Sequence, residues 1–306
     1  MRDTFINTLT GYCEKMDNIF IISGDAGLGV FDKFKQNYPG RFLNLGIAEQ
    51  NAISFSAGLA LTGHKVYYYN IIPFVLYRCY EQVRNDVCYQ KLPVVLVGIG
   101  SGVTYAPQGM THYAVEDLGL AQTLPNLTVF SPSDPIEVKF ATQYSIDAAK
   151  PVYIRLAKSG EPRIHKDENL DITLPQLIEE GKELAIVFHG SVSQEVVLAG
   201  KILEKEKIFP RLISLPLLQP LNSERLFAML EDVDCVISVE EHFISTGLGG
   251  ILMRQYAKMR PRWKFFPLGI PDGFIHEIKD LKGMRSHFGI SGEKISEFII
   301  GVLKGR

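Results

Sequence analysis

Short apolar runs alternate with helical patterns along the whole chain. In the first half these runs are rich in β-branched and aromatic residues and are bounded by Gly, Pro, Asn or Ser, as buried strands are. They cover 19–23, 66–71, 93–99, 127–130 and 151–155. Between them, apolar residues recur at helical spacing over 48–62, 73–90, 115–123 and 134–149. Because the strands lack polar alternation and are separated by helices, the pattern predicts a mainly parallel sheet covered on both faces.

The segment 156–182 breaks this pattern with charged residues, Pro and Gly, which is typical of a linker between domains. A second series of strands and helices follows it. We expect strands over 184–189, 211–215, 234–239 and 264–268, and helices over 191–207, 222–232 and 247–260. The sequence therefore predicts an α/β protein with two open α/β domains, 1–160 and a smaller one over 183–306, joined by a linker over 161–182.

Composition and charge narrow the classes of function. The chain has 306 residues, 46% of them hydrophobic, and its 32 Lys and Arg nearly balance its 34 Asp and Glu. This balance provides no basic field for nucleic acid or an anionic membrane, and no apolar run approaches the roughly 20 residues that span a bilayer. The cysteines have no metal-ligand spacing and are too few for a disulfide framework. We therefore expect a cytoplasmic protein that binds neither nucleic acid nor membrane.

Three loops that follow predicted strands carry polar residues, and open parallel sheets bind ligands at the carboxyl ends of their strands. The run GDAGLG at 24–29 lacks the spacing of a phosphate-binding loop and is most simply a tight turn. Glu49 lies in the run LGIAEQNA at 45–52, where a strand end passes through Gly46 into a helix; it stands in the first turn, where the helix dipole favours a capping acid. His112 lies in a loop before a helix, where an imidazole could exchange a proton near neutral pH. Taken singly, none of these loops specifies a function.

Taken together, the order and spacing of the motifs resemble the C-terminal half of transketolase and of the related 1-deoxyxylulose-5-phosphate synthase. In the first half the resemblance rests on RFLNLGIAEQNAISFSAGLALTG (41–63), GMTHYAVEDLG (109–119) and PNLTVFSPSDPIE (125–137). In the second half it rests on RLISLPLLQPLN (211–222), VISVEEHFISTGLGG (236–250) and PLGIPDGF (267–274). It covers essentially the whole chain. It implies a pyrimidine-binding domain followed by a transketolase C-terminal domain.

The resemblance implies thiamine diphosphate as cofactor, with a role for several residues. The family glutamate that matches Glu49 hydrogen-bonds the cofactor's aminopyrimidine and promotes the imino tautomer that removes the thiazolium C2 proton. An aromatic residue stacks on the same ring, and the local register leaves Phe74 and Val75 as alternatives for that position. Phe74 is the better candidate because an aromatic face adds stacking to burial. Val103, at the end of a Gly-rich run, is also placed among the cofactor-binding residues.

The resemblance places substrate contacts on His112, Gln108 and Arg155. His112 matches the family histidine that contacts the reacting substrate oxygen and acts in catalysis. Gln108 stands where transketolases carry Asp, so a charge is lost although hydrogen bonding remains possible. Gly100 and Ser101 occupy positions where family members hold substrate phosphate with a basic residue. These departures argue against an ordinary sugar-phosphate donor, unless Arg155, Lys158 or a partner chain supplies the charge.

Family members also need a domain that binds the cofactor's diphosphate through a metal. The only similar pattern here, Gly24-Asp25-Ala26 with Asn51, lies too close to Glu49, because one short segment cannot hold both ends of the extended cofactor. We therefore expect no metal ligand in this chain. A separate subunit resembling the N-terminal half of transketolase should supply the Mg site, in an α2β2 assembly with the cofactor at an interface.

The expected function is that of the C-terminal subunit of a split enzyme that transfers a two-carbon ketol unit from a ketose to an aldehyde. One alternative is the beta subunit of a 2-oxo-acid dehydrogenase, which has the same two domains and also needs a partner. Another is a non-catalytic subunit that retains the fold. In the second domain, the GLGG run at 247–250 and the cluster Glu240, Glu241 and His242 are interpreted as packing features rather than as an anion or metal site.

Overall fold

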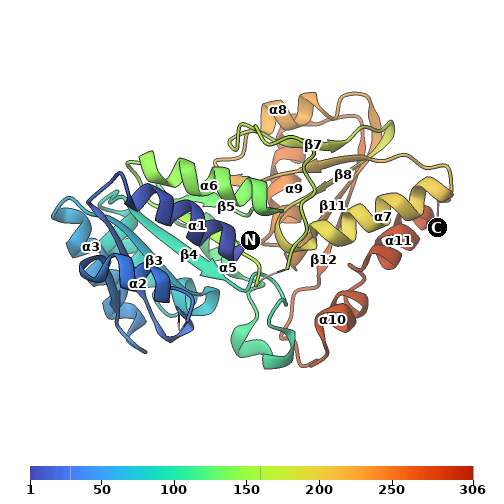
Figure 1. Cartoon of the computed structure of the whole chain (residues 1–306). Helices are drawn as coiled ribbons and strands as arrows, with labels where there is room; N and C mark the ends of the chain where they lie inside the picture. Colours follow the sequence, from blue (N-terminus) through green and yellow to red (C-terminus); the bar gives the residue numbers. More distant parts are fainter. Residues whose placement is uncertain (28, 159, 306) are drawn as a thin grey trace.

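Two β-sheets, each flanked by helices, form the framework of the chain, of which the computed structural model describes residues 1–27, 29–158 and 160–305 (Figure 1). The first sheet has seven strands in the order β10-β5-β6-β4-β3-β1-β2, and all neighbours are parallel except β10 and β5. Its strands are β1 Ile19–Ser23, β2 Phe42–Asn44, β3 Lys65–Ile71, β4 Val94–Ile99, β5 Thr128–Phe130, β6 Val152–Leu156 and β10 Leu217–Gln219. The prediction of a mainly parallel sheet is confirmed.

Helices cover both faces of the first sheet, as the non-alternating strands predicted. Tyr67 and Tyr69 of β3 pack in the cluster that includes helices α1 (Arg2–Cys13), α2 (Asp32–Asn37) and α6 (Pro135–Asp147). Val66 and Tyr68 point to the other face, towards α3 (Glu49–Leu61) and α5 (Asp117–Gln122). Figure 1 shows α1 and α6 side by side over the sheet. Both sets of β3 side chains are therefore buried.

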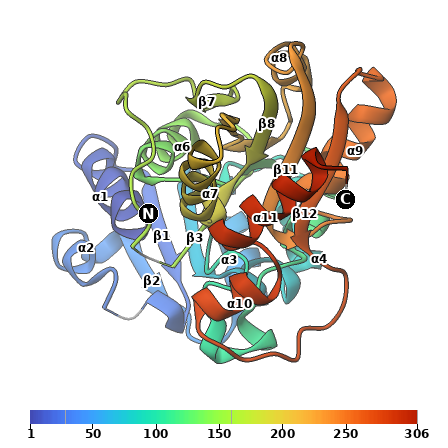
Figure 2. The same ribbon diagram turned by 90° about the vertical axis from the view of Figure 1, so that its right-hand side faces the viewer.

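The second sheet has five strands in the order β12-β11-β8-β9-β7, parallel except for β7 against β9. Its strands are β7 Gln176–Glu179, β8 Glu183–Phe188, β9 Arg211–Ser214, β11 Val233–Phe243 and β12 Lys264–Ile270. Helices α7 (Ser193–Lys205) and α11 (Gly292–Leu303) lie side by side on one face (Figure 2). Helices α8 (Ser223–Ala228) and α9 (Leu248–Met259) pack on the other. The second α/β unit is confirmed.

The two halves are more tightly joined than their sequence pattern suggested. Strand β7 lies inside the predicted linker 161–182 but pairs with β9, so the end of that segment belongs to the second sheet. Strand β10 lies in the second half of the chain but completes the edge of the first sheet against β5. One apolar cluster also contains residues of both halves, among them Tyr153 and Leu248. The domains therefore share an apolar cluster, and one strand from the second half of the chain completes the first sheet.

The predicted helix over 73–90 is replaced by an irregular segment. Wide π-helical turns over Pro73–Tyr77 and Val83–Cys88 flank the short helix α4 (Tyr80–Gln82). Such turns are rare and are found frequently at functional sites. Helices α2 and α10 (Leu281–His287) and helix α11 were not predicted at all. In the part of the chain that the structure describes, no helix has the length and apolar character needed to cross a bilayer.

Candidate active site

Glu49 is the first residue of α3, which follows the loop after β2. The loop turns sharply: Asn44 accepts a hydrogen bond from the backbone N–H of Gly46, which has a φ of +63°. Glu49 is the acidic residue of the first turn, and the N-cap residue Ala48 makes no side-chain capping hydrogen bond. Only 5% of Glu49 is exposed, and its Oε2 lies 2.7 Å from Nη1 of Arg78. This nearly buried carboxylate is therefore paired with a cation from the segment that follows β3.

Phe74 and Val75 lie in the first π-helical turn after β3 and point in different directions. Phe74 is half-buried, and the guanidinium carbon of Arg78 lies 4.4 Å from the centre of its ring. The Phe74 ring also lies edge-on to His112, with 5.9 Å between ring centres. Val75 is fully buried in the hydrophobic core. Of the two alternatives, the structure brings Phe74 next to His112 and to the ion-pair partner of Glu49.

His112 ends a short 3₁₀ turn, Met110–His112, in the loop that follows β4. It is half-buried, and its Nδ1 lies 2.9 Å from Oγ1 of Thr111. Its ring also lies 6.0 Å from that of Tyr105. Nζ of Lys158 in turn lies 5.1 Å from the centre of the Tyr105 ring. A row of side chains, here called the open row, thus runs from Glu49 by way of Arg78 to Phe74, His112, Tyr105 and Lys158.

The loop also explains two of the departures from the family pattern. Gly100 has a φ of +90°, and a Cβ at this position would lie 2.2 Å from the Tyr105 ring, so no side chain fits there. Ser101 is fully buried. Neither residue can reach a substrate, whereas Gln108, on the 3₁₀ turn Ala106–Gln108, is exposed at the same loop as His112.

Two residues predicted for the site lie elsewhere. The Val103 side chain is buried in the core of the second domain, and its backbone N–H donates to Oε1 of Glu241 at 2.8 Å. Arg155 is 1% exposed; its Nε donates to Asp117 at 2.8 Å and its Nη2 donates to the carbonyl of Ala114 at 2.8 Å. The second domain covers this end of β6, so the cofactor contact expected of Val103 and the substrate contact expected of Arg155 are not supported.

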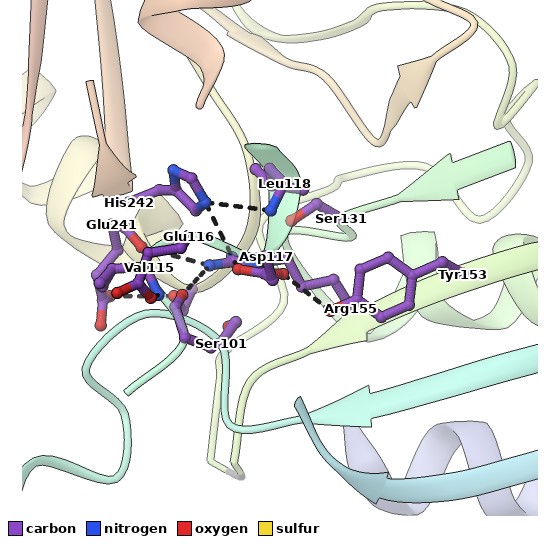
Figure 3. A network of polar contacts seen from close by, with 12 residues as sticks. Ser101, Val115, Glu116, Asp117, Leu118, Ser131, Tyr153, Arg155, Glu241 and His242 are labelled. Carbon is purple, nitrogen blue, oxygen red and sulfur yellow. Dashed lines mark hydrogen bonds and ion pairs between the residues drawn. The ribbon is translucent and has the colours of Figure 1, made fainter. Parts of the chain in front are cut away.

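Arg155 belongs instead to a buried network between the domains (Figure 3). Oδ2 of Asp117 accepts hydrogen bonds from Arg155 and from the hydroxyl of Tyr153, both at 2.8 Å. From the second domain, Nε2 of His242 accepts from the backbone N–H of Leu118 at 3.2 Å. Burial lowers the pKa of His242 to about 4, so the ring is neutral and free to accept. These polar contacts hold the two domains together.

Glu240 and Glu241 are structural as well. The Glu240 carboxylate accepts from the backbone N–H groups of Leu248 and Gly249 at 2.6 and 2.7 Å, so it caps α9. A Cβ on Gly247 would lie 1.8 Å from that carboxylate, which explains the glycine. Glu241 pairs with Arg285 at 2.7 Å. The interpretation as packing features is confirmed, and the described residues contain no His, Cys, Asp and Glu cluster that could hold a metal.

Sequence reasoning missed Arg78 and Tyr105. Arg78 lies four residues after Phe74, a spacing that places side chains on one face of a helical turn, so the pattern contained a signal for it. Tyr105 had no signal, because its position depends on the conformation of the glycine-rich loop. Gly24, in the rejected metal pattern, is packed so tightly that a Cβ would lie 2.5 Å from Nδ2 of Asn70.

Comparison with known proteins identifies the same family for both domains. The family model for the transketolase pyrimidine binding domain matches residues 1–162, and the model for the transketolase C-terminal domain matches residues 176–295. One of the subunits of the apulose-4-phosphate transketolase of Actinobacillus succinogenes is 33% identical over 293 residues, which cover 94% of this chain and 93% of the relative.

Two further relatives differ in length: one is about twice as long as this chain, and the other is about as long. The 1-deoxy-D-xylulose-5-phosphate synthase of Dictyoglomus thermophilum is 33% identical over 306 residues, but the match covers 49% of that protein, so this chain spans about half its length. A solved structure described as a split gene transketolase, inactive beta4 tetramer, superposes with a TM-score of 0.86 at 27% identity and covers 97% of this chain and 95% of the other. The chain belongs to the transketolase family and corresponds to the C-terminal subunit of a split, transketolase-like enzyme.

Proposed function

We propose that this subunit holds the aminopyrimidine end of thiamine diphosphate and that the completed enzyme transfers a two-carbon ketol unit from a ketose to an aldehyde. The observation that carries the proposal is the position of Glu49, a carboxylate only 5% exposed that lies beside an accessible aromatic ring, with Arg78 between them. A flat, polar-edged heterocycle fits between such groups, because one stacks on its face and the other binds its edge. The residues present therefore fit the cofactor's ring.

Three side chains of the open row, Glu49, Phe74 and His112, have a task in this proposal. Bound thiamine diphosphate supplies the nucleophilic carbon on which the ketol unit is carried. Glu49 holds a proton against a ring nitrogen, and its seclusion from water strengthens that hydrogen bond. Phe74 orients the ring by stacking. His112, whose Nδ1 lies beside Thr111, keeps Nε2 free to give or take a proton at a substrate oxygen.

A second polypeptide completes the site in this proposal. The relative from Actinobacillus succinogenes is itself named as one subunit of a transketolase, and it matches this chain almost end to end, whereas the synthases are about twice as long. We therefore assign the diphosphate and Mg²⁺ contacts to an N-terminal-half subunit, with an α2β2 assembly as the working state. The solved relative is described as an inactive beta4 tetramer, which supports the proposal that a second polypeptide is needed for activity.

The substrate contacts proposed here are His112 and Gln108. Gln108 is exposed on the loop of His112 and offers an uncharged hydrogen-bonding group to a donor hydroxyl. A relative in Clostridium, 30% identical over 96% of this chain, is named a 6-deoxy-6-sulfo-D-fructose transketolase subunit. The apulose-4-phosphate enzyme is named for a phosphorylated sugar, so the two relatives together support a ketose donor with an anionic group and do not select phosphate over sulfonate.

The test is to isolate the chain with and without its N-terminal-half partner and to titrate both preparations with thiamine diphosphate and Mg²⁺ by calorimetry. We expect saturable binding by the complex and weak binding by the chain alone. Ketose and 2-oxo-acid donors are then compared in the complex, and turnover of ketoses only is expected. A preference for 2-oxo acids with a lipoyl acceptor would instead identify a dehydrogenase-type subunit, and absence of cofactor binding by every complex would refute the split-enzyme proposal.

A further inference from the structure

The guanidinium of Arg78 makes both contacts that the proposed site offers to the cofactor's ring. Its Nη1 lies 2.7 Å from Oε2 of Glu49, and its central carbon lies 4.4 Å from the centre of the Phe74 ring. The group is planar, carries hydrogen-bond donors at its edge and stacks through its face. An aminopyrimidine has the same three properties. One side chain of the protein therefore occupies the edge and the face that a flat heterocycle would use.

We propose that Arg78 is a resident substitute for the aminopyrimidine: it fills the slot between Glu49 and Phe74 in the free subunit and is displaced when cofactor binds. This inference rests on the proposed function, because it takes Glu49 and Phe74 as the cofactor contacts. It adds a residue that sets cofactor affinity without being one of those contacts.

The physical reason for such a substitute lies in the burial of Glu49. A carboxylate that is 5% exposed loses most of its hydration, and a cation within hydrogen-bonding distance compensates for that loss. Without Arg78, the free subunit would contain a nearly buried, unpaired charge beside an uncovered aromatic face. With Arg78 in place, the Glu49 carboxylate is paired with a cation and the Phe74 ring is covered before the partner subunit and the cofactor bind.

Arg78 can leave the slot without unfolding its surroundings. Its side chain is 42% exposed, so a rotation towards solvent is open to it. Its backbone, in contrast, is fixed: the N–H donates to the carbonyl of Pro73 at 3.1 Å, and the carbonyl accepts from the side chain of Gln50 at 3.2 Å. The segment from Phe74 to Arg78 therefore keeps its place while the guanidinium moves. Only the ion pair and the cation–π contact are exchanged for contacts of the ring.

Because the cofactor displaces Arg78, removal of Arg78 should have opposite effects on cofactor affinity and on the stability of the free subunit. A protein whose binding-competent state is only partly populated binds ligand with an affinity reduced by that fraction. Removal of Arg78 should therefore tighten cofactor binding, because nothing has to be displaced. The same removal should weaken the free subunit, because Glu49 loses its partner. A residue that merely supported the fold would lower stability and leave affinity unchanged or lower.

The experiment measures the dissociation constant of thiamine diphosphate with Mg²⁺ by calorimetry on the assembled complex, for wild type and for Arg78→Ala. We expect binding about 3- to 10-fold tighter in the variant, the size of a partly exposed ion pair and its stacking contact. Arg78→Lys keeps the charge but not the planar group and should tighten binding by less. Arg84→Ala is the matched control, since Arg84 is exposed on the neighbouring π-helical turn and its side chain donates to Asn85.

The free subunit gives the second readout, its thermal unfolding temperature. We expect Arg78→Ala to lower it, Arg84→Ala to leave it unchanged, and the loss to shrink when Glu49→Gln is already present. Affinity that is unchanged or weaker in both Arg78 variants would overturn the inference while the wild-type complex still binds cofactor. A wild-type complex that fails to bind cofactor would instead refute the proposed function, and the two failures are thus distinct.

Discussion

Two groups of residues rich in charged side chains lie near the carboxyl ends of the strands of the first sheet. One group retains exposed surface, and the other is buried. The open site consists of Glu49, Phe74, Arg78 and His112, and three of these four side chains retain exposed surface. The domain interface network consists of Asp117, Arg155, Glu241, His242 and Arg285, all nearly or fully buried. The difference comes from the second domain, which covers one part of the sheet edge and leaves the other uncovered.

The network is closed because both domains contribute to it. Arg285 from α10 binds Glu241 of β11, while Arg155 of β6 binds Asp117 at the start of α5. In the open site, all the charged and aromatic groups come from the first domain. The types of residue present therefore do not distinguish a structural charge from a functional one. Burial by the second domain distinguishes them.

The largest expected effect comes from Arg155→Met. The substitution leaves the Asp117 carboxylate buried without its cation, which costs on the order of 3–5 kcal/mol. Urea unfolding of the free subunit measures it, with Arg225→Met on the exposed face of α8 as the control that should change nothing. Normal stability combined with weakened substrate binding would mean that Arg155 belongs to the open site after all.

His112→Asn should lower activity and leave stability almost unchanged, whereas Arg155→Met should lower stability. Loss of a proton donor or acceptor at a substrate oxygen lowers kcat/KM by about 100-fold or more. Because His112 is only half-buried, the thermal unfolding temperature of the variant should stay within about 2 °C of wild type, as surface changes usually do. Steady-state assays of the complex and thermal unfolding of the same preparation check both parts.

A pH titration separates the network from the open site. The folded-state pKa of His242 lies near 4, below its ordinary value of 6.5, because burial disfavours the charged ring. The unfolded chain therefore takes up this proton first, and stability from the neutral ring is lost as pH falls from 6.5 towards 4. Glu240 contributes a pH dependence of the opposite sign. Burial raises its pKa to about 8, so its contribution to stability increases as pH falls.

Comparison with His242→Gln isolates the histidine from such opposing groups. The stability advantage of wild type over the variant should shrink by about 2–3 kcal/mol between pH 7 and pH 4, because only wild type carries the histidine contribution. Urea unfolding at a series of pH values measures this difference. A constant difference over the whole range would show that His242 is accessible to protons in the folded state.

The smallest effect distinguishes Phe74 from its neighbour. Phe74→Leu should weaken thiamine diphosphate binding by the complex about 3- to 10-fold, through loss of ring stacking. Val75→Ala should leave the affinity unchanged but lower the unfolding free energy by about 1 kcal/mol or more, because Val75 is fully buried in the core. The opposite pattern would reassign the ring contact to position 75.

The sequence predicted most of the fold because most strands are continuous apolar runs. Strand β1 matches its predicted range at both ends, and β3, β4, β5 and β6 differ by one residue at one or both ends. Strands β7 and β10 could not be predicted, because each has three or four residues and pairs with a segment far away in the chain. The segment 73–90 has helical periodicity, but tertiary contacts widen it into π-helical turns.

The site was predicted in part, for a related reason. Glu49, His112 and Gln108 stand in motifs of fixed order, whereas the resemblance left Phe74 and Val75 as alternatives. The structure brings Phe74 beside His112 and beside the ion-pair partner of Glu49. Arg155 stands in an equally recognisable strand, but its burial depends on Ala114 and Asp117 and on coverage by β11. The pairing of Arg78 with Glu49 depends on an irregular turn that the pattern does not encode.

The most direct test of the role of Glu49 is the exchange of the C2 proton of thiamine diphosphate for deuterium in the assembled complex, followed by NMR for wild type and Glu49→Gln. We expect exchange far faster than in free cofactor for wild type and a return to the free-cofactor rate in the variant. Calorimetry must show that the variant still binds cofactor. Exchange in Glu49→Gln as fast as in wild type would contradict the assignment of Glu49 and, with it, the functional role of the open site.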